Sequence, residues 1–192
     1  MKKIIATLMI ALCVVGSAMA QEEYIDFERK QAIDSLALEK VRDLSKYVKI
    51  VGSKETSFSE ANRVIDRAEE LFMSDAEIGV SSLSSNQITY YRVRKYFEHL
   101  MRLNYDRVEI EWYNIEYVSD LQRQPDGTYV GVITIFQTFR GYDAEGNMVY
   151  KDTTKKDITV YVKRKETQIG GRTIGFWDVL LGDMRVKETT NR

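Results

Sequence analysis

Cysteine, proline and histidine are almost absent from this chain, whose 192 residues include Cys13, Pro125 and His99 and no second residue of these types. A single cysteine excludes an intrachain disulfide and a cysteine-based metal site. A single histidine excludes a pair of histidine ligands and a Ser-His-Asp arrangement with a spare base. We therefore expect no metal and no cofactor.

An excess of charge and a long apolar run are also missing. The chain has 28 Lys and Arg residues against 29 Asp and Glu residues, a formal net charge of −1. Nucleic-acid-binding proteins usually present a strongly basic face, so we expect no nucleic-acid partner. The apolar stretch from Ile4 to Gly16 is too short for a membrane span, which takes roughly 20 residues. We expect no transmembrane segment in the mature chain.

What the N-terminus does have is the pattern of a secretory signal peptide. Lys2 and Lys3 precede the apolar stretch, which closes on Ser17-Ala18-Met19-Ala20, a sequence of small residues typical of a cleavage site. We predict that residues 1–20 are removed and that the protein is exported, with the periplasm favoured over secretion or outer-membrane association. In an alternative, Cys13 is the acylated residue of a lipoprotein, but Leu12 is bulky where a small residue is expected.

The remaining 172 residues have the size of one domain. Apolar residues recur at three- and four-residue spacings over 24–48, 58–73 and 88–103, which predicts three amphipathic helices. Ser57 and Glu60 form a capping-box pattern before the second of these. A short strand is expected over 76–82, followed by a polar loop over 81–86.

The second half of the chain predicts a meander of strands. Apolar residues alternate over 108–118 but change parity near Tyr113 and Asn114, which indicates a β-bulge. Three further strands are expected, over 128–142, 148–163 and 172–187, separated by turns that contain glycine. The predicted fold is α+β, with three N-terminal helices packed on one face of a curved, mostly antiparallel sheet.

This order of elements resembles the nuclear transport factor 2-like superfamily, the cystatin-like cone fold. The resemblance rests on the helix Glu60 to Phe72 that runs into Asp75 to Val80, the helix ending at Leu103, the bent strand Val108 to Val118, and the closing Phe176 to Leu180. It implies one globular domain, with residues 58–192 as the superfamily domain and residues 21–57 as a lead-in helix and linker. The superfamily includes isomerase-like enzymes, dehydratases and epoxide hydrolases, and also many non-catalytic binding domains.

Enzymes of this superfamily rely on a carboxylate or histidine inside an apolar cavity. Asp178 lies between Phe176 and Leu180 on one parity of the last strand, where an inward-facing carboxylate would lie, although a structural acid is the simpler interpretation. We interpret His99 as a surface or boundary residue. The residues predicted to line a ligand pocket are Trp112, Tyr113, Tyr117, Phe136, Phe176 and Asp178.

Some predicted strands have apolar residues on both faces, as in the stretch from Tyr129 to Phe139. A sheet with helices on one side needs only one apolar face, so something has to cover the second. The first helix could do so, or a homodimer or a protein partner could dock there.

With no cysteine in the mature chain, one histidine and no paired acids at a motif spacing, the sequence leans against an enzyme. We expect an exported, non-catalytic binding or assembly component of the bacterial envelope, using the sheet face or the cone pocket. Two alternatives stay open. One is a small cavity enzyme or ligand carrier, isomerase- or dehydratase-like, with Asp178 and a tyrosine such as Tyr113 or Tyr117 as acid and base. The other is a purely structural module of a surface complex.

Overall fold

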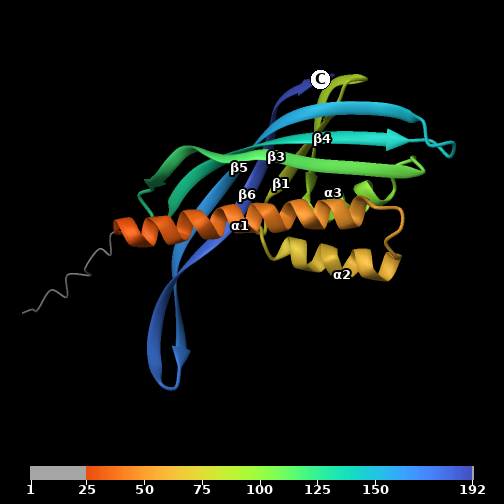
Figure 1. Ribbon diagram of the computed structural model, residues 1–192. Coiled ribbons are helices and arrows are strands. Elements are labelled where there is room, and N and C mark those ends of the chain that lie inside the picture. Colours follow the sequence, from red (N-terminus) through yellow and green to blue (C-terminus); the bar gives the residue numbers. More distant parts are fainter. Residues whose placement is uncertain (1–24, 192) are drawn as a thin grey trace, which may run out of the picture.

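The protein forms two layers, with three helices on one face of a single curved sheet (Figure 1). The computed structural model describes residues 25–191, so the predicted signal peptide lies outside the described residues. The elements in chain order are α1 (Phe27–Gly52), α2 (Phe58–Glu69), β1 (Glu77–Ser82), β2 (Ser85–Arg92), α3 (Val93–Met101), β3 (Arg107–Arg123), β4 (Tyr129–Tyr142), β5 (Met148–Ile169) and β6 (Arg172–Thr190). None of these helices is long and apolar enough to cross a membrane.

The sheet has six strands in the order β2-β1-β6-β5-β4-β3. Strands β1 and β6 run parallel, where Ile78 pairs with Met184, and the other neighbouring strands are antiparallel. The predicted α+β class, with three helices packed on a curved and mostly antiparallel sheet, is confirmed. The assignment of residues 21–57 and 58–192 to one globular domain stays a prediction.

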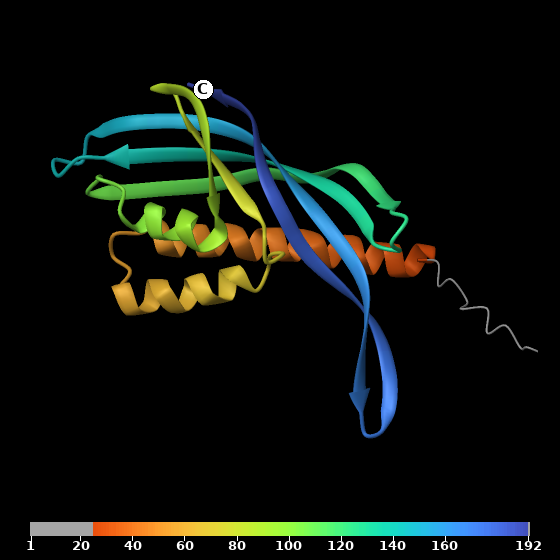
Figure 2. The ribbon, with the colours of Figure 1, turned by 180° about the vertical axis from the view of Figure 1, so that it is seen from behind.

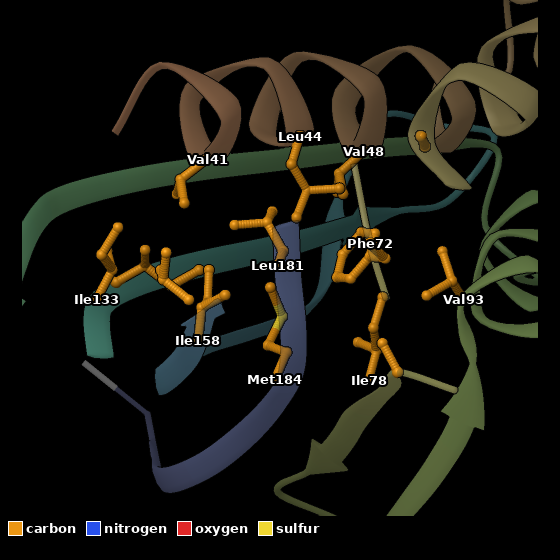
Figure 3. Packing of buried hydrophobic residues seen from close by; sticks show 14 of the residues in the cluster. Val41, Leu44, Val48, Phe72, Ile78, Val93, Ile133, Ile158, Leu181 and Met184 are labelled. Carbon is orange, nitrogen blue, oxygen red and sulfur yellow. The ribbon is translucent and has the colours of Figure 1, made fainter. Parts of the chain in front are cut away.

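The core lies between α1 and the concave face of the sheet. Val41, Leu44 and Val48 follow one another at helical spacing on α1 and are buried against the strands. Figure 3 shows these side chains directed toward residues of the sheet such as Leu181. Truncating a fully buried leucine such as Leu44 to alanine costs about 2–5 kcal/mol, so this seam holds the two layers together.

Each of the first two helices begins at a residue whose side chain satisfies a free backbone amide. Asp26 accepts a hydrogen bond from the amide of Arg29 at 2.8 Å, and Ser57 accepts one from the amide of Glu60 at 3.2 Å. The predicted helix start at Ser57 is therefore confirmed. Such caps stabilise a helix by about 1 kcal/mol relative to alanine.

The predicted third helix is wrong in its first five residues. Residues 88–92 belong to β2, which pairs with β1 so that Tyr91 lies opposite Ile78 and Thr89 opposite Val80. The β-branched and aromatic residues of this stretch suit a strand, and α3 begins only at Val93. The resulting β1–β2 hairpin stands beside α3 and forms one wall of the cavity described below.

The predicted β-bulge in β3 is confirmed. The register between β3 and β4 shifts between Tyr113 and Glu116, and Asn114 has a positive φ of 49°. An extra residue bends a strand and increases its twist. The bend adds to the curvature of the sheet around the helices (Figure 2).

The convex face of the sheet carries no helix (Figure 2). Its aromatic residues pack against neighbours of the same face: Tyr113 stacks on Phe136 with ring centroids 5.6 Å apart, and the ring of Tyr161 occupies the space beside Gly182. The side chains of the convex face thus cover part of that second apolar face themselves. The predicted homodimer or protein partner on this face gains no support from the described residues.

Candidate functional site

A cavity of about 340 Å³ opens between α3, the β1–β2 hairpin and the concave face of β3, β4 and β5. One end of the cone is therefore hollow, whereas the other end is filled by α1. The cavity is lined by Val80, Ser81, Ser82, Ser84, Gln87, Thr89, Tyr91, Tyr96, His99, Leu100, Leu103, Tyr105, Ile110, Gln137, Phe139, Tyr150, Asp152, Thr154 and Lys156.

The alternation of β5 places a row of polar residues in this cavity. Ile158, Val160 and Val162 are fully buried and belong to the core. Side chains two residues apart on a strand share a face, so the same face continues toward the start of β5 with polar residues. The members of that continuation are Lys156, Thr154, Asp152 and Tyr150. The concave face of β5 therefore changes from apolar core to polar cavity at Lys156.

Tyr150 and Asp152 form a hydrogen-bonded pair inside the cavity. The hydroxyl of Tyr150 donates to Oδ2 of Asp152 at 2.6 Å and accepts from the backbone amide of Leu83, in the β1–β2 turn, at 3.0 Å. Asp152 is buried, and burial raises the pKa of its carboxyl although the Tyr150 hydroxyl and the Lys156 charge act in the opposite direction. Burial and the bond to Asp152 raise the pKa of Tyr150 to about 12.

Lys156 is the cavity's cation and is only 2% exposed. Its amine lies over the ring of Tyr96, 6.0 Å from the centroid. Burial lowers the pKa of Lys156 to about 8, and the carboxyl of Asp152 offsets only part of this effect. Desolvation disfavours the charged form of an amine, so Lys156 changes its protonation state near pH 8.

Three further cavity residues supply polar groups and an aromatic wall. His99 stacks on Tyr91 with ring centroids 5.3 Å apart, which holds its imidazole at the edge of the cavity. Gln137 accepts a hydrogen bond from the indole nitrogen of Trp112 at 3.1 Å through its amide oxygen, and its amide NH₂ is a hydrogen-bond donor. Tyr105 packs on Phe139 and on Tyr150 and completes an apolar side of the cavity.

The cavity suits acid–base chemistry on a small molecule. A general acid or base works best when its pKa lies near the working pH, and burial has moved both Asp152 and Lys156 in that direction. The two groups share one face of one strand, with Thr154 between them. Perturbed pKa values gathered in a cleft are typical of functional sites.

Asp178 and Phe176 do not belong to the cavity. Asp178 lies opposite Lys163 in the register of β5 and β6, and its carboxylate forms an ion pair with Lys165 at 2.6 Å. Its side chain lies on the same face of β6 as that of Leu180, as the sequence indicated, but this is the convex face of the sheet. Phe176 is 44% exposed, beyond the body of the cone. The candidate catalytic role of Asp178 is therefore corrected.

The other four predicted pocket residues also lie outside the cavity lining. Trp112 and Tyr117 are on the concave face, but Tyr117 lies beneath α1, close to Asp34, and Trp112 reaches the cavity only through Gln137. Tyr113 and Phe136 are on the convex face, where they border a shallow hollow with Lys155. Trp112 and Tyr117 pack against the core inside the cone, and none of the four residues lines the cavity.

The sequence contained a signal for the residues that were missed. Every second residue from Ile158 to Val162 is apolar. Counting back from Ile158 in steps of two gives the other residues of the same strand face, Lys156, Thr154, Asp152 and Tyr150. His99 was interpreted as a surface or boundary residue; it is exposed, and it also lines the cavity. No periodicity on α3 could show that a hairpin would leave space beside it.

The part of the chain from residue 25 to residue 191 contains no cluster of three or more His, Cys, Asp and Glu residues suited to a metal ion. The polar groups of the cavity are the amine of Lys156, the carboxyl of Asp152, the imidazole of His99, the amides of two Gln residues and the hydroxyls of several Ser, Thr and Tyr residues.

Comparisons with known proteins give similarity in fold. No protein-family model and no curated protein matches the chain. A structure assigned as a scytalone dehydratase from Novosphingobium aromaticivorans is similar with a TM-score of 0.44 and 12% identity, over 86% of this chain and 91% of that one. A type 2 hexachlorocyclohexane dehydrochlorinase has a TM-score of 0.38 and 16% identity, over 83% and 91%. The type 3 enzyme from Novosphingobium barchaimii has the same score and identity, over 83% and 92%.

The expectation of a non-catalytic binding or assembly component is corrected by the side chains that line the cavity. It rested on the lack of suitable acid–base groups, and the cavity holds Asp152, Tyr150, Lys156 and His99. The observed layout of helices and sheet is that of the cone fold, so the resemblance to the nuclear transport factor 2-like superfamily is confirmed at the level of the fold.

Proposed function

We propose that this protein is a small enzyme that moves protons on a ligand held in the cone cavity, in the manner of an isomerase or a dehydratase. The observation that carries the proposal is the buried pair of Asp152 and Tyr150, joined by a hydrogen bond of 2.6 Å inside an open cavity. Asp152 takes the part that the sequence had given to Asp178.

The roles follow from the chemistry of each group. Asp152 is the base that removes a proton from carbon, since burial raises the pKa of its carboxyl and makes the carboxylate a better proton acceptor. Tyr150 orients that carboxyl and is itself held by the amide of Leu83. Lys156 and the Gln137 amide stabilise negative charge that develops on the ligand.

The cavity sets the class of ligand. Its volume of about 340 Å³ lies at the lower end of the range for small-molecule sites. Tyr105, Phe139 and Leu103 form an apolar wall beside the polar row of β5, because Tyr105 and Phe139 both pack on the ring of Tyr150. A compact ring or short chain with one polar substituent fits this division.

Proton transfer can be tested before the natural substrate is known. A panel of small cyclic ketones, secondary alcohols and alkyl chlorides is incubated with the protein in D₂O, and NMR follows the exchange or loss of carbon-bound protons. We expect at least one compound to react faster than in buffer. Asp152→Asn should slow this reaction about 100-fold or more, the usual contribution of a positioned base.

Asp178→Asn is the matched control, because it makes the same chemical change outside the cavity. It should react at the wild-type rate. Tyr150→Phe keeps the ring and removes the hydroxyl, so it should give an intermediate rate. Equal rates for Asp152→Asn and the wild type, or no reaction above buffer over the whole panel, would overturn the proposal.

We also propose that the enzyme is exported to the periplasm, on the support of the sequence of residues 1–20 alone. N-terminal sequencing of the protein from fractionated cells tests this. The expected mature chain begins at Gln21 in the periplasmic fraction, whereas an intact Met1 in the cytoplasmic fraction would contradict it.

A further inference from the structure

The side chain of Lys156 places a buried amine, a potential nucleophile, in the cavity. Its side chain is 2% exposed, projects from the centre of β5 and reaches the ring of Tyr96 on α3. Among the residues that the structure describes, Lys156 takes part in no ion pair, although many other Lys and Arg side chains there do. Lysine is seldom buried without a charged partner, so its position calls for a chemical reason.

Burial also prepares the amine for reaction. Only the neutral form of an amine attacks an electrophile, and desolvation lowers the pKa of Lys156 to about 8 from its ordinary 10.5. Near pH 7 the neutral fraction at Lys156 is on the order of 100-fold higher than at an ordinary surface lysine.

The residues needed to complete an amine–carbonyl reaction lie on the same strand face. Loss of water from the first adduct requires an acid, and Asp152 is a buried carboxyl whose pKa is raised. The hydroxyl of Tyr150 is hydrogen-bonded to that carboxyl and can pass a proton with it. The row from Tyr150 to Lys156 thus combines a nucleophile with a proton donor in one cavity.

We propose that Lys156 forms a Schiff base with the carbonyl group of an aldehyde or ketone substrate. This inference rests on the proposed function and names its substrate class. The carbonyl substrate lies in the cavity that Lys156 lines, so that its carbon meets Nζ of Lys156.

The steps balance without an oxidant or a reductant. The lone pair of Nζ forms a bond to the carbonyl carbon, the carbonyl π electrons move to oxygen, and one proton passes from nitrogen to that oxygen. The hydroxyl group then takes a proton from the carboxyl of Asp152 and leaves as water, which gives the protonated imine. Its positive charge acidifies the neighbouring C–H bond, which the carboxylate of Asp152 deprotonates. Reprotonation and addition of water release the product and restore the amine.

Reductive trapping tests the proposal on the mature chain. The protein is incubated at pH 7 with benzaldehyde, a compact aromatic carbonyl probe, and sodium cyanoborohydride, which reduces the imine to a stable secondary amine. Fragment-ion mass spectrometry then locates the added benzyl group. We expect Lys156 to be labelled at least tenfold faster than Lys155.

Lys155 is the internal control, since it is the adjacent residue on the opposite face of β5 and lies over the ring of Phe136. The rate at Lys156 should rise from pH 6 to about 8 and then level off. Labelling of Lys156 no faster than that of Lys155 at pH 7 would overturn the proposal.

Two variants separate this inference from the proposed function. Lys156→Arg keeps a positive charge in the cavity but cannot form an imine, so it should lose both trapping and proton exchange. If Lys156→Arg exchanges protons at the wild-type rate while Asp152→Asn does not, the Schiff base is wrong and acid–base catalysis stands. If both variants behave as the wild type, the proposed function falls as well.

Discussion

The buried amine of Lys156 ties the stability of the fold to pH. Its pKa in the folded protein is about 8, below its ordinary 10.5, so the unfolded chain binds more protons between these two values. Stability therefore rises as the pH increases from about 8 to 10.5, and below pH 8 the folded protein carries the full cost of the buried charge. That cost is roughly 3 kcal/mol at most.

Lys156→Met should make the protein more stable at pH 7 because it removes the buried charge and keeps an unbranched side chain of similar length. We expect the free energy of unfolding in urea to rise by roughly 1–3 kcal/mol at pH 7. The gain should shrink at pH 10, where the amine of the wild type is already neutral in the fold.

Lys155→Met is the matched control for this measurement. Lys155 lies on the convex face, so its replacement should change the free energy of unfolding by less than about 0.5 kcal/mol at either pH. A Lys156→Met protein that is less stable than the wild type at pH 7 would show that the amine makes favourable contacts that exceed its desolvation.

At the same scale, Asp152→Asn should separate catalysis from stability. Burial raises the pKa of Asp152, so the carboxylate is disfavoured in the fold and its contribution to stability falls as the pH rises from about 4 through that raised pKa. The neutral amide that replaces the carboxyl has no such cost. We expect a thermal midpoint at pH 7 equal to or above that of the wild type, measured on the same preparation that has lost proton exchange. A lower midpoint would indicate that the loss of activity comes from misfolding.

Residue-level reasoning from the sequence failed at Asp178 for a physical reason. The alternation of residues along a strand shows which side chains share a face, and Asp178 does share a face with Leu180. It does not show which of the two faces meets the helices. On the last strand both parities are apolar, since Val179 is fully buried and Leu180 half-buried. On β5 the residues that follow Ile158 are apolar on one face only. The pattern of that strand therefore indicated more clearly which face meets the helices.

At the scale of single elements, the bulge of β3 depends on Asn114. This residue has a φ of 49°, in the left-handed region that glycine and asparagine adopt at low cost and β-branched residues do not. Asn114→Val should lower the free energy of unfolding in urea by about 1–2 kcal/mol.

Asn114→Gly is the companion variant, because glycine adopts a positive φ without strain. It should be as stable as the wild type or more stable. Since Asn114 is exposed, loss of packing cannot explain a difference between the two variants. Equal destabilisation by Val and Gly would show that the asparagine side chain, and not its backbone conformation, supports the bulge.

The sequence predicted elements well where one local signal dominated. The turns at Gly127 and Gly146 have the positive φ values of 80° and 84° that their glycines suggested. The stretch from residue 88 to 92 carried two signals, a helical spacing and a run of β-branched and aromatic residues. Pairing with β1 decided between them, and that pairing is a tertiary contact. The cavity depends on this hairpin, so it could not be seen before the fold was known.

At the scale of the whole molecule, β5 and β6 extend beyond the cone as a two-stranded arm (Figure 1). Strand β4 pairs with β5 only as far as Val162, opposite Tyr129, so the arm has no third strand. Residues 164–176 are all exposed. A two-stranded ribbon without a covered face contributes little stability of its own, so the core and the cavity form a unit that does not include the arm.

Shortening the arm tests this division of the molecule. Residues 165–176 are replaced by Asn-Gly, which joins Arg164 to Trp177 through a two-residue hairpin turn. The ion pair of Lys165 with Asp178 is lost, but both groups are partly exposed and such pairs contribute less than about 1 kcal/mol. We expect the free energy of unfolding to change by less than about 1 kcal/mol and the rate of proton exchange to stay at the wild-type value. The removal of the exposed Ile169, Ile174 and Phe176 should also reduce aggregation, measured by light scattering on heating. A loss of several kcal/mol, or of proton exchange, would instead make the arm a part of the folded unit that builds the site.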